Sequence, residues 1–455
     1  MSLTVEEIVK ATGGEPLCGD SMSFSGVSID SRTVMEGEIF FALRGERFDG
    51  HDFLDSALST GSAAVVDHGF EPAQKGKAVI QVKDTLKALQ DLALYMRLKH
   101  DIPVVAITGS NGKTTTKEMT YSILSRRFKV LKNKGNLNNH IGLPLSLTRL
   151  VPSDEVMVLE LGMNSTGEIR RLCEIAMPSH GVITNIGSAH IGRLGSRDAI
   201  RIAKLELLEG ITTAVLNGDD DFLMDGVRGF KGKIITFSIR KDSHVMAKDL
   251  YATEMGNSFT LAFRDGKSVP VRLNVHGLFN VYNSLAASAV CFSIGMNIEE
   301  IRTALEAYTA FPMRFEVLRR GSITVINDSY NANPSSVFEA LKELAGMRGG
   351  GRLVAVLGDM SELGDFTEDA HRNVVKTAIE LGIDVLVSVG EMMCLAAGDA
   401  GDGIKGKKPV IYKFGDVEEL TLNIEKILKP GDTLLLKGSR AMNMDRALRG
   451  ITDVI

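Results

Sequence analysis

Short apolar runs alternate with helical patterns along this chain of 455 residues. At the start of the chain the alternation predicts a small α/β domain over residues 1–82, with a helix beginning after Thr4 and a second helix at residues 53–58. The predicted strands of this domain are residues 27–32, 38–43 and 63–66.

The middle of the chain, residues 83–311, is organised around one buried strand and the turn after it. Residues 104–107 are apolar and mostly β-branched, which is typical of a buried parallel strand. They lead into Thr-Gly-Ser-Asn-Gly-Lys-Thr-Thr, and a helical pattern follows. This succession predicts a central P-loop domain with a mostly parallel sheet. Short strands separated by glycine turns predict a β-meander over residues 245–275. Pro103 and Pro312 mark the junctions of this domain with its neighbours.

From residue 312 onward, strands and helices alternate regularly, which predicts a Rossmann-like, doubly wound domain over residues 312–455. The predicted strands are residues 323–327, 353–357, 385–389, 410–413 and 433–436. The predicted helices are residues 335–347, 367–381, 417–428 and 443–449. Polar loops follow three of these strands, and we expect them to face the P-loop: residues 328–334, 358–360 and 437–440.

In the P-loop each residue type suits the binding of a nucleotide. Lys113 would reach the β- and γ-phosphates of ATP, and the Thr114 hydroxyl would bind Mg²⁺. The loop residues expected to surround the phosphates are Gly109, Ser110, Asn111, Gly112 and Thr115. The spacing departs from the general pattern G-x-x-x-x-G-K-[ST], whose first glycine would fall at Ile107. The alternative is a plain glycine turn with a surface lysine.

Two further side chains are expected at the edge of the sheet that carries the P-loop. Glu160 lies near the end of an apolar strand, where a carboxylate is costly unless it is paired or bound to a metal. His190 lies just beyond the next predicted strand, residues 181–187. We predict that both serve a Mg²⁺ site, either as ligands or beside the ligands. The alternative for His190 is a purely structural histidine.

Lys204 belongs to a predicted helix over residues 199–210. Ile200 and Leu208, four residues to either side, carry no charge, so the spacing puts Lys204 on the apolar stripe of the helix. The charge of Lys204 then needs a partner or a chemical modification. The alternative is a solvated lysine, which is the usual state of a lysine on a helix.

Composition narrows the class of protein. Charged residues make up 24% of the chain and hydrophobic residues 44%, which is ordinary for a globular protein. The net charge of −5 argues against nucleic acid as an obligate partner, because phosphate backbones need a basic surface. The four cysteines lack a C-x-x-C spacing and suit free thiols in a reducing cytoplasm. We see no signal peptide and no apolar run long enough to span a membrane.

These motifs, in this order, resemble the Mur ligase family of ATP-dependent amide-forming enzymes over nearly the whole chain. The segments that carry the resemblance are residues 108–115, residues 185–187 leading to His190, Asn280 with Asn283, Arg314, and residues 328–334. Residues 358–364 and 437–440 are similar to the branch that adds D-alanyl-D-alanine to UDP-N-acetylmuramoyl-tripeptide. The D-N-P-R type motif usual in the branch that adds diaminopimelate or lysine does not occur in the sequence.

The resemblance implies a mechanism in which ATP phosphorylates the terminal carboxylate of the tripeptide and the amine of D-alanyl-D-alanine attacks the acyl phosphate. It implies two Mg²⁺ ions, and their ligands would come from Thr114, Glu160, His190 and a Lys204 carbamylated by CO₂. The residues implied to bind ATP outside the P-loop are Asn280, Asn283, Arg314 and Asp328. The residues implied to bind the other two substrates are Ser31, Arg32, Asn138 and Asn139, which would lie near the uridine diphosphate, together with Asn331, Lys437, Ser439 and Arg440.

Other functions compete with this interpretation. A sibling ligase for another amino acid, or an enzyme like folylpolyglutamate synthase, would share the same core, although the folate branch generally lacks a separate uridine-binding domain. A P-loop kinase or ATPase would share only the phosphate loop. A UDP-sugar-binding protein with a decayed ATP site is disfavoured by the intact Lys113 and Glu160. We therefore expect a monomeric ligase of the bacterial cytoplasm, with catalytic residues Lys113, Glu160, His190 and Lys204.

Overall fold

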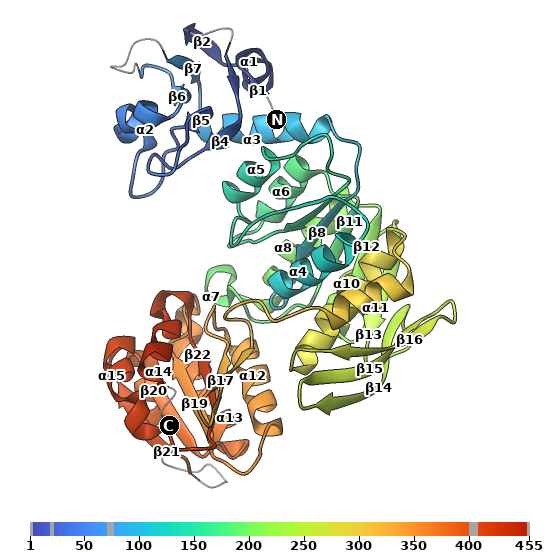
Figure 1. Ribbon diagram of the computed structural model, residues 1–455, viewed down its shortest axis with the longest axis vertical. Helices are drawn as coiled ribbons and strands as arrows, with labels where there is room; N and C mark the ends of the chain where they lie inside the picture. Colours follow the sequence, from blue (N-terminus) through green and yellow to red (C-terminus); the bar gives the residue numbers. More distant parts are fainter. Residues whose placement is uncertain (1–2, 19–21, 71–76, 400–407, 453–455) are drawn as a thin grey trace.

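The computed structural model describes residues 3–18, 22–70, 77–399 and 408–452. Within these ranges the strands form a small two-stranded sheet, β1 (Leu3–Thr4) with β3 (Ser23–Phe24), and three larger sheets. Each larger sheet is the core of one lobe, and Figure 1 shows the three lobes following the chain from blue through green and yellow to red. The predicted α/β class with three domains is therefore confirmed. None of the described helices is both long and apolar enough to cross a membrane.

The N-terminal lobe is built on a sheet of five strands, all parallel except the edge strand β2. In spatial order these strands are β2 (Glu15–Cys18), β7 (Ala78–Val82), β6 (Ala63–Asp67), β5 (Glu38–Phe41) and β4 (Gly26–Ser28). Its helices are α1 (Val5–Thr12), the 3₁₀ helix η1 (Gly50–Phe53) and α2 (Leu54–Thr60). The predicted strand 27–32 was too long: β4 ends at Ser28, because the Asp30 carboxylate accepts the backbone N–H of Arg32 and turns the chain.

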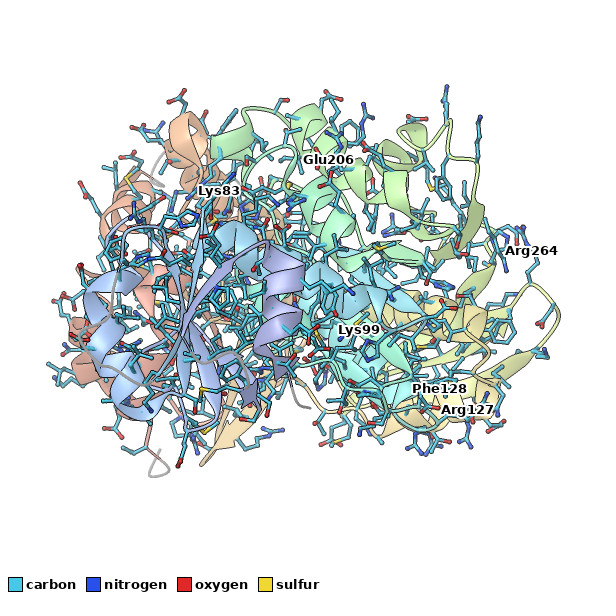
Figure 2. The ribbon with its side chains drawn as sticks, turned by 90° about the horizontal axis from the view of Figure 1, so that it is seen from above. Lys83, Lys99, Arg127, Phe128, Glu206 and Arg264 are labelled. Atoms are coloured by element: carbon cyan, nitrogen blue, oxygen red, sulfur yellow. The ribbon has the colours of Figure 1, made fainter. Side chains whose placement is uncertain are left out.

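Helix α3 (Thr85–Leu98) joins the first two lobes. It packs against α1 on one side and against α5 (Gly142–Leu147) and α6 (Glu168–Ala176) on the other. Just beyond its end, Lys99 forms an ion pair with Glu7 of α1; Lys99 is labelled in Figure 2. On the central side, the Gln90 amide donates to the carbonyl of His140 at 3.0 Å. One helix therefore fixes the N-terminal lobe against the central lobe.

The central sheet has nine strands. In spatial order these are β16 (Ser268–Leu273), β15 (Gly256–Phe263), β14 (Val245–Thr253), β13 (Lys233–Ser238), β12 (Thr213–Asn217), β11 (His180–Ile183), β8 (Val104–Thr108), β10 (Val156–Glu160) and β9 (Val130–Lys132). The pairs from β9 to β14 are parallel, and β14, β15 and β16 form an antiparallel meander. The meander was predicted from the turns, but its pairing with β13 was not. It extends the sheet instead of forming a separate unit.

Both faces of the central sheet are covered, as a parallel sheet requires. In β8, Val105 and Ile107 pack on the face covered by α4 (Lys113–Leu124) and α10 (Leu278–Ser293), while Val104 and Ala106 pack on the opposite face. The other helices of this lobe are α7 (Ile191–Leu194), α8 (Arg197–Leu205), the 3₁₀ helix η2 (Glu206–Gly210), α9 (Asp221–Asp225) and α11 (Ile298–Glu306). This packing brings the carboxyl ends of β8, β10, β11 and β12 to one edge.

The C-terminal sheet has six strands, which are parallel except for the edge strand β17. In spatial order they are β17 (Glu316–Arg320), β18 (Ile323–Asn327), β22 (Thr433–Lys437), β19 (Leu353–Gly358), β20 (Val385–Val389) and β21 (Val410–Phe414). Its helical segments are α12 (Pro334–Gly346), η3 (Gly364–Phe366), α13 (Thr367–Glu380), α14 (Glu391–Asp399), α15 (Val417–Ile427), η4 (Arg440–Met442) and η5 (Met444–Gly450).

Three features of this lobe differ from the sequence prediction. β17 and α14 were not predicted, and the helix expected at residues 443–449 is the 3₁₀ helix η5. η5 follows Asn443, whose left-handed backbone (φ 49°) cannot continue a right-handed helix from the preceding turn. The doubly wound alternation itself is as predicted.

Candidate active site

The P-loop connects β8 to α4, and two of its glycines cannot be replaced without a clash. Gly109 has a φ of 146°, and a Cβ there would lie 1.9 Å from the Thr184 hydroxyl oxygen. Gly112 has a φ of 81°, and a Cβ there would lie 2.2 Å from the side-chain oxygen of Asn283. Both positions therefore require glycine for two reasons, the positive φ and the close approach of a neighbouring side chain. This is expected of a loop that wraps its backbone around an anion.

Lys113 opens α4 and lies folded back over the loop. Its Nζ donates to the carbonyl of Gly109 at 2.8 Å and to that of Ser110 at 3.4 Å. Burial lowers the pKa of Lys113; the carboxylate of Glu160 opposes that shift, and the charge of Arg314 adds to it. Lys113 is half-buried, and as a hydrogen-bond donor it would gain from an anionic ligand in the loop.

Glu160, at the end of β10, is only 3% exposed and accepts two neutral donors. The Thr114 hydroxyl donates to Oε2 at 2.9 Å, and the amide of Asn138 donates to Oε1 at 2.8 Å. The Asn133 side chain holds the backbone of Glu160 through bonds of 2.9 and 3.0 Å. Asn138, which was expected beside UDP, therefore lies against the carboxylate next to the P-loop. Its neighbour Asn139 accepts the N–H of Gly142, the first residue of α5, at 2.8 Å.

These oxygens suit a hard cation such as Mg²⁺. Among the described residues no three His, Cys, Asp or Glu side chains come together as a complete cation site. Mg²⁺ is commonly held by one or two carboxylates together with phosphate oxygens and water. Glu160 and Thr114, at the start of the P-loop helix, are a donor set of that kind: a buried carboxylate with only neutral partners beside a hydroxyl. The residues present therefore fit Mg²⁺ shared with a nucleotide.

His190 reaches the C-terminal lobe with its side chain. It has a left-handed backbone (φ 64°), and its Nδ1 lies 2.8 Å from the Glu362 carboxylate of the C-terminal lobe. That hydrogen bond lowers the pKa of Glu362, and burial partly opposes the shift. The structure thus brings Thr114 and Glu160 into direct contact, while the hydrogen bond of His190 goes to Glu362. Glu362 lies in the segment 358–364 that carries part of the resemblance, but it was not predicted as a site residue.

Lys204 lies in the last turn of α8 and is 1% exposed, so the prediction that it faces the apolar side is confirmed. No described residue forms a hydrogen bond or an ion pair with its amine. Burial lowers the pKa of Lys204 well below its usual value, and the nearby charge of Lys113 lowers it further. Burial without a counter-charge therefore favours the neutral amine, which is the nucleophilic form, over the charged form.

Two asparagines lie beneath the loop at the start of α10. The Asn283 amide donates to the side-chain oxygen of Asn280 at 3.2 Å, and the Thr116 hydroxyl donates to that of Asn283 at 3.3 Å. Asn280 in turn donates to the carbonyl of His276 at 2.7 Å. The two side chains share one face of α10, as residues three positions apart on a helix do, and they lie against the P-loop.

The C-terminal lobe reaches the P-loop directly. Asn111 donates to the Ser335 hydroxyl at 2.9 Å and accepts the amide of Asn333 at 2.8 Å. Arg314 donates to the Thr114 hydroxyl at 3.1 Å, and its guanidinium lies 3.7 Å from the centre of the Tyr330 ring. The predicted proximity of residues 328–334 to the P-loop is therefore confirmed.

The other predicted binding residues of the C-terminal lobe form a neighbouring group. Lys437 pairs with Asp328 at 2.5 Å and also donates to the carbonyl of Asn331 at 3.0 Å. Ser439 is 2% exposed, and its hydroxyl has no hydrogen-bond partner in the described part of the chain. Arg440 lies further out, 3.7 Å from the carboxylate of Asp445, and does not bond to the P-loop.

In the N-terminal lobe, Arg32 is exposed and forms a bidentate pair with Asp30, at 2.9 and 2.7 Å. Ser31 lies in the same turn. The structure does not bring these two residues into contact with the residues around the P-loop, so the N-terminal lobe would have to offer its own binding surface.

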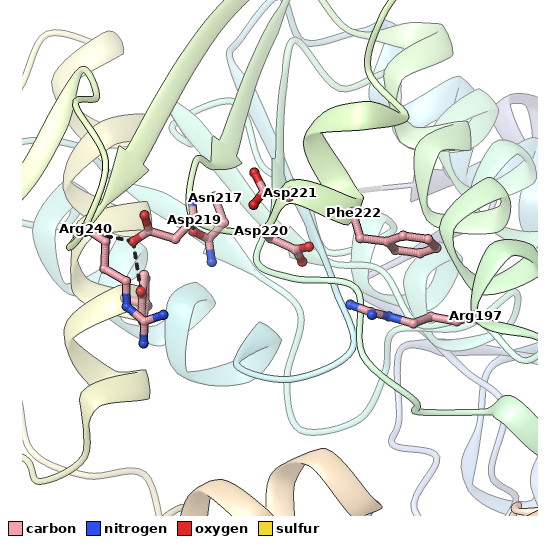
Figure 3. Close-up of a pocket in the computed structure, with 8 residues that line it drawn as sticks. Arg197, Asn217, Asp219, Asp220, Asp221, Phe222 and Arg240 are labelled. Carbon is pink, nitrogen blue, oxygen red and sulfur yellow. Dashed lines mark hydrogen bonds between the residues drawn. The ribbon is translucent and has the colours of Figure 1, made fainter.

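A pocket of about 450 Å³ opens at the carboxyl ends of β12 and β13, and Figure 3 shows its lining. The Asp219 carboxylate accepts the Tyr282 hydroxyl at 2.9 Å and the backbone N–H of Arg240 at 3.1 Å. The Arg197 guanidinium lies 4.4 Å from the ring centre of Phe222. Because these polar groups already have protein partners, we interpret the pocket as a structural feature of the sheet edge.

Comparisons with known proteins agree along the whole chain. Three family models match: "Mur ligase family, catalytic domain" over residues 23–97, "Mur ligase middle domain" over residues 107–291, and "Mur ligase, glutamate ligase domain" over residues 313–440. A relative from Bacillus subtilis is 33% identical, with 99% of this chain and 97% of the relative covered. The chain belongs to the Mur ligase family. Another Mur ligase, from Escherichia coli, is 34% identical, with 100% of this chain and 99% of the relative covered. Both relatives are named UDP-N-acetylmuramoyl-tripeptide--D-alanyl-D-alanine ligase.

Solved structures of Mur ligases share the arrangement of lobes. A crystal structure of MurF from Acinetobacter baumannii has a TM-score of 0.90 at 32% identity, with 99% of both chains covered. MurF from Thermotoga maritima in complex with ADP has a TM-score of 0.82 at 29% identity, with 94% of this chain and 96% of that chain covered. Folylpolyglutamate synthase from Mycobacterium tuberculosis shares the fold alone, with a TM-score of 0.62 at 17% identity.

Sequence reasoning missed two residues that shape this Mur ligase site. Asn133 holds the backbone of Glu160, and the fully buried Lys117 of α4 donates to the Asn133 carbonyl at 3.0 Å. A lysine four residues after Lys113 would lie one helical turn further along, facing the sheet, which was a usable signal. The role of Asn133 had no such signal, since it depends on the path of the loop.

The clash at Gly112 leads to a first prediction for this Mur ligase. Gly112→Ala should weaken ADP binding by about tenfold or more, because the new methyl group displaces Asn283 and the loop loses its left-handed turn. Gly266→Ala is the matched control: its φ is 89°, with no atom within 4 Å of the added Cβ. Calorimetric titration with ADP measures the effect. Equal ADP affinity in both variants would contradict the account of the loop.

Proposed function

We propose that this protein joins D-alanyl-D-alanine to UDP-N-acetylmuramoyl-tripeptide, converting ATP to ADP and phosphate. The observation that carries the proposal is similarity over the full length to ligases of that name, together with a P-loop lysine beside a buried carboxylate. The product, UDP-N-acetylmuramoyl-pentapeptide, is a precursor of peptidoglycan. Because the reaction uses ATP, we propose that it occurs in the bacterial cytoplasm.

The chemistry divides into two steps. A carboxylate oxygen of the tripeptide attacks the γ-phosphorus of ATP, forming an acyl phosphate and releasing ADP. The amine of D-alanyl-D-alanine then attacks the acyl carbon, the amide bond forms, and phosphate leaves with the former carboxylate oxygen. Since phosphoryl transfer depends on positioning and on neutralising oxygen charge, the protein mainly contributes fixed donors.

Lys113 and the P-loop N–H groups are the donors we assign to the phosphates. Lys113 is held over the loop by the Gly109 carbonyl and would exchange that bond for a phosphate oxygen. Mg²⁺, when bound, would neutralise further charge on the phosphate oxygens. We assign Thr114 and Glu160 to one Mg²⁺ ion, and His190 with Lys204 to a second. Asn280, Asn283, Arg314 and Asp328 are proposed to bind the nucleoside part of ATP.

Lys204 is proposed to work as a carbamate. Its amine, in the neutral form, would attack CO₂, forming an N–C bond and releasing one proton, so that a buried amine becomes an anion with two oxygens. Two properties support this: the amine is 1% exposed without a hydrogen-bond partner among the described residues, and its pKa is lowered well below the usual value by burial. An anion at this position would also compensate the nearby positive charge of Lys113.

The three lobes are proposed to supply the three substrate sites. Residues 1–82 would bind the UDP-muramoyl peptide through Ser31 and Arg32, residues 83–311 would bind ATP, and residues 312–455 would bind the dipeptide. Asn138 and Asn139 are proposed to contact the muramoyl peptide near the acyl carbon. The dipeptide is proposed to contact Asn331, Lys437, Ser439 and Arg440. Since all these residues come from one chain, we propose that the monomer is the active unit.

The Ser439 hydroxyl gives a second prediction. A buried hydroxyl without a partner is costly, and a carboxylate of the incoming dipeptide would satisfy it. Ser439→Ala should raise the KM for D-alanyl-D-alanine about tenfold and leave the KM for ATP unchanged. Ser388→Ala is the matched control, because its hydroxyl is also buried and unpartnered but lies within β20. An unchanged dipeptide KM in Ser439→Ala would argue against this site.

Phosphate release from ATP, followed with and without an added amine, tests the function. With the UDP-muramoyl-tripeptide present, release should depend on D-alanyl-D-alanine and should be slower with single amino acids such as D-glutamate or L-lysine. Preference for a single amino acid would indicate a sibling ligase. Phosphate release at the same rate with and without the amine would indicate an ATPase or kinase and would refute the proposal.

A further inference from the structure

Two segments from different lobes meet backbone to backbone at the edge of the active site. They are α7 of the central lobe and residues 362–364 of the C-terminal lobe, and Figure 1 shows α7 lying next to the C-terminal lobe. The N–H of Gly192 donates to the carbonyl of Glu362 at 3.1 Å. A Cβ on Gly192 would lie 2.4 Å from the backbone nitrogen of Gly364, so glycine is required for this approach.

Unusual backbone conformations direct the side chains at this contact toward each other. His190 and Glu362 both have a φ of 64°, which is rare outside glycine. The Glu362 carboxylate lies 2.8 Å from Nδ1 of His190 and 3.3 Å from the guanidinium of Arg193. Residues kept in such conformations concentrate at sites where their placement has a function.

The loop that carries Glu362 is anchored within its own lobe. The Asp359 carboxylate accepts the N–H of Met393 at 2.8 Å, and the Asp359 carbonyl accepts the N–H of Ser439 at 3.0 Å. The N–H of Met360 donates to the buried His371 at 3.0 Å. Glu362 therefore moves with the lobe, and its loop is bonded to the segment that we assign to the dipeptide.

We propose that Glu362 is a positioning residue, which orients His190 only when the C-terminal lobe is docked as in this structure. A histidine that binds a metal through one ring nitrogen commonly donates its other N–H to a carboxylate, which fixes both the tautomer and the ring orientation. With Nδ1–H donated to Glu362, Nε2 of His190 carries the free lone pair. Docking of the lobe that brings the dipeptide would thus complete the metal site. This inference rests on the proposed function.

A simpler role is possible for the same carboxylate, namely to hold the lobes together through Arg193. The two roles can be separated by substitution. Arg193→Ala removes the ion pair and leaves the hydrogen bond to His190, whereas Glu362→Ala removes both. Glu362→Gln keeps an oxygen that can accept from Nδ1–H but loses the charge. Glu368→Ala, in α13, serves as the control, because it removes an exposed carboxylate whose ion-pair partner among the described residues is Arg372.

The test measures Mn²⁺ binding to the ADP complex of each full-length variant by electron paramagnetic resonance. Glu362→Ala should weaken Mn²⁺ binding about 10- to 100-fold. Glu362→Gln should retain most of the affinity, and Arg193→Ala and Glu368→Ala should match the wild type. In assays of phosphate release, Glu362→Ala should need more Mg²⁺ and show a lower kcat, with the KM for the tripeptide unchanged.

Unchanged Mn²⁺ affinity in both Glu362 variants would overturn the inference, as would an Arg193→Ala variant that loses as much affinity as Glu362→Ala. Because Glu362→Gln preserves the shape of the side chain, it keeps the test valid if Glu362→Ala fails to fold. Failure of the proposed function has a different signature: the wild type would release phosphate without any dependence on the amine.

Discussion

Lys113→Ala should lower the rate of amide formation by roughly 10³-fold or more, with the fold intact. The lysine is half-buried and, in the described part of the chain, donates to the carbonyls of Gly109 and Ser110 and forms no ion pair, so its removal breaks no ion pair there. In the transition state, however, no other donor could replace its charge at the transferring phosphoryl group. Single-turnover kinetics with saturating ATP would measure the loss.

Two controls accompany this prediction. Lys117→Ala removes the fully buried lysine of α4, which donates to the Asn133 carbonyl and forms an ion pair with Glu118. It should reduce stability more than Lys113→Ala does, because it breaks the ties between the helix and the loop. Circular dichroism would verify that Lys113→Ala is folded. Ligation near the wild-type rate in a folded Lys113→Ala protein would refute the assignment of the P-loop.

Lys204→Ala should be nearly inactive, with a loss of about 10²-fold or more, because the proposed carbamate is a metal ligand. Short carboxylic acids such as formate or acetate should restore part of the activity, since they can supply carboxylate oxygens in the space that the side chain leaves. The wild type should itself lose activity in buffer freed of CO₂ and recover it on addition of bicarbonate.

The carbamate can also be observed directly. With ¹³C-labelled bicarbonate, the wild type should show a carbamate resonance that is missing in Lys204→Ala. Lys99→Ala is a suitable control, because Lys99 is a partly exposed lysine that pairs with Glu7. If Lys204→Ala were fully active and the wild type showed no labelled carbamate, Lys204 would be only a buried structural lysine.

Local patterns in the sequence predicted the elements whose causes are local. The P-loop follows from an apolar strand, two glycines and Lys113, which are adjacent in the chain. The burial of Lys204 follows from helical periodicity, and the structure confirms it at 1% exposure. The alternation of strands and helices was enough to predict three α/β domains.

What the sequence could not reveal depends on contacts between distant segments. Glu362 and His190 lie 172 positions apart in the chain, and Arg314 and Thr114 lie 200 positions apart. No periodic pattern in the sequence connects the two members of either pair. Asn138 was assigned to UDP, but the path of its loop turns it toward Glu160. The meander joins the central sheet because β13 and β14 pair in parallel, and strand pairing of this kind is not encoded in local spacing.

The central claim is that this protein activates a carboxylate with ATP and transfers it to an amine. The most direct test uses UDP-N-acetylmuramoyl-tripeptide labelled with ¹⁸O in its terminal carboxylate, together with ATP, Mg²⁺ and D-alanyl-D-alanine. Mass spectrometry should find the pentapeptide product and one ¹⁸O atom in each phosphate released, because the attacking oxygen leaves with the phosphate. Phosphate without ¹⁸O, or labelled tripeptide left unchanged while ATP is consumed, would contradict the account.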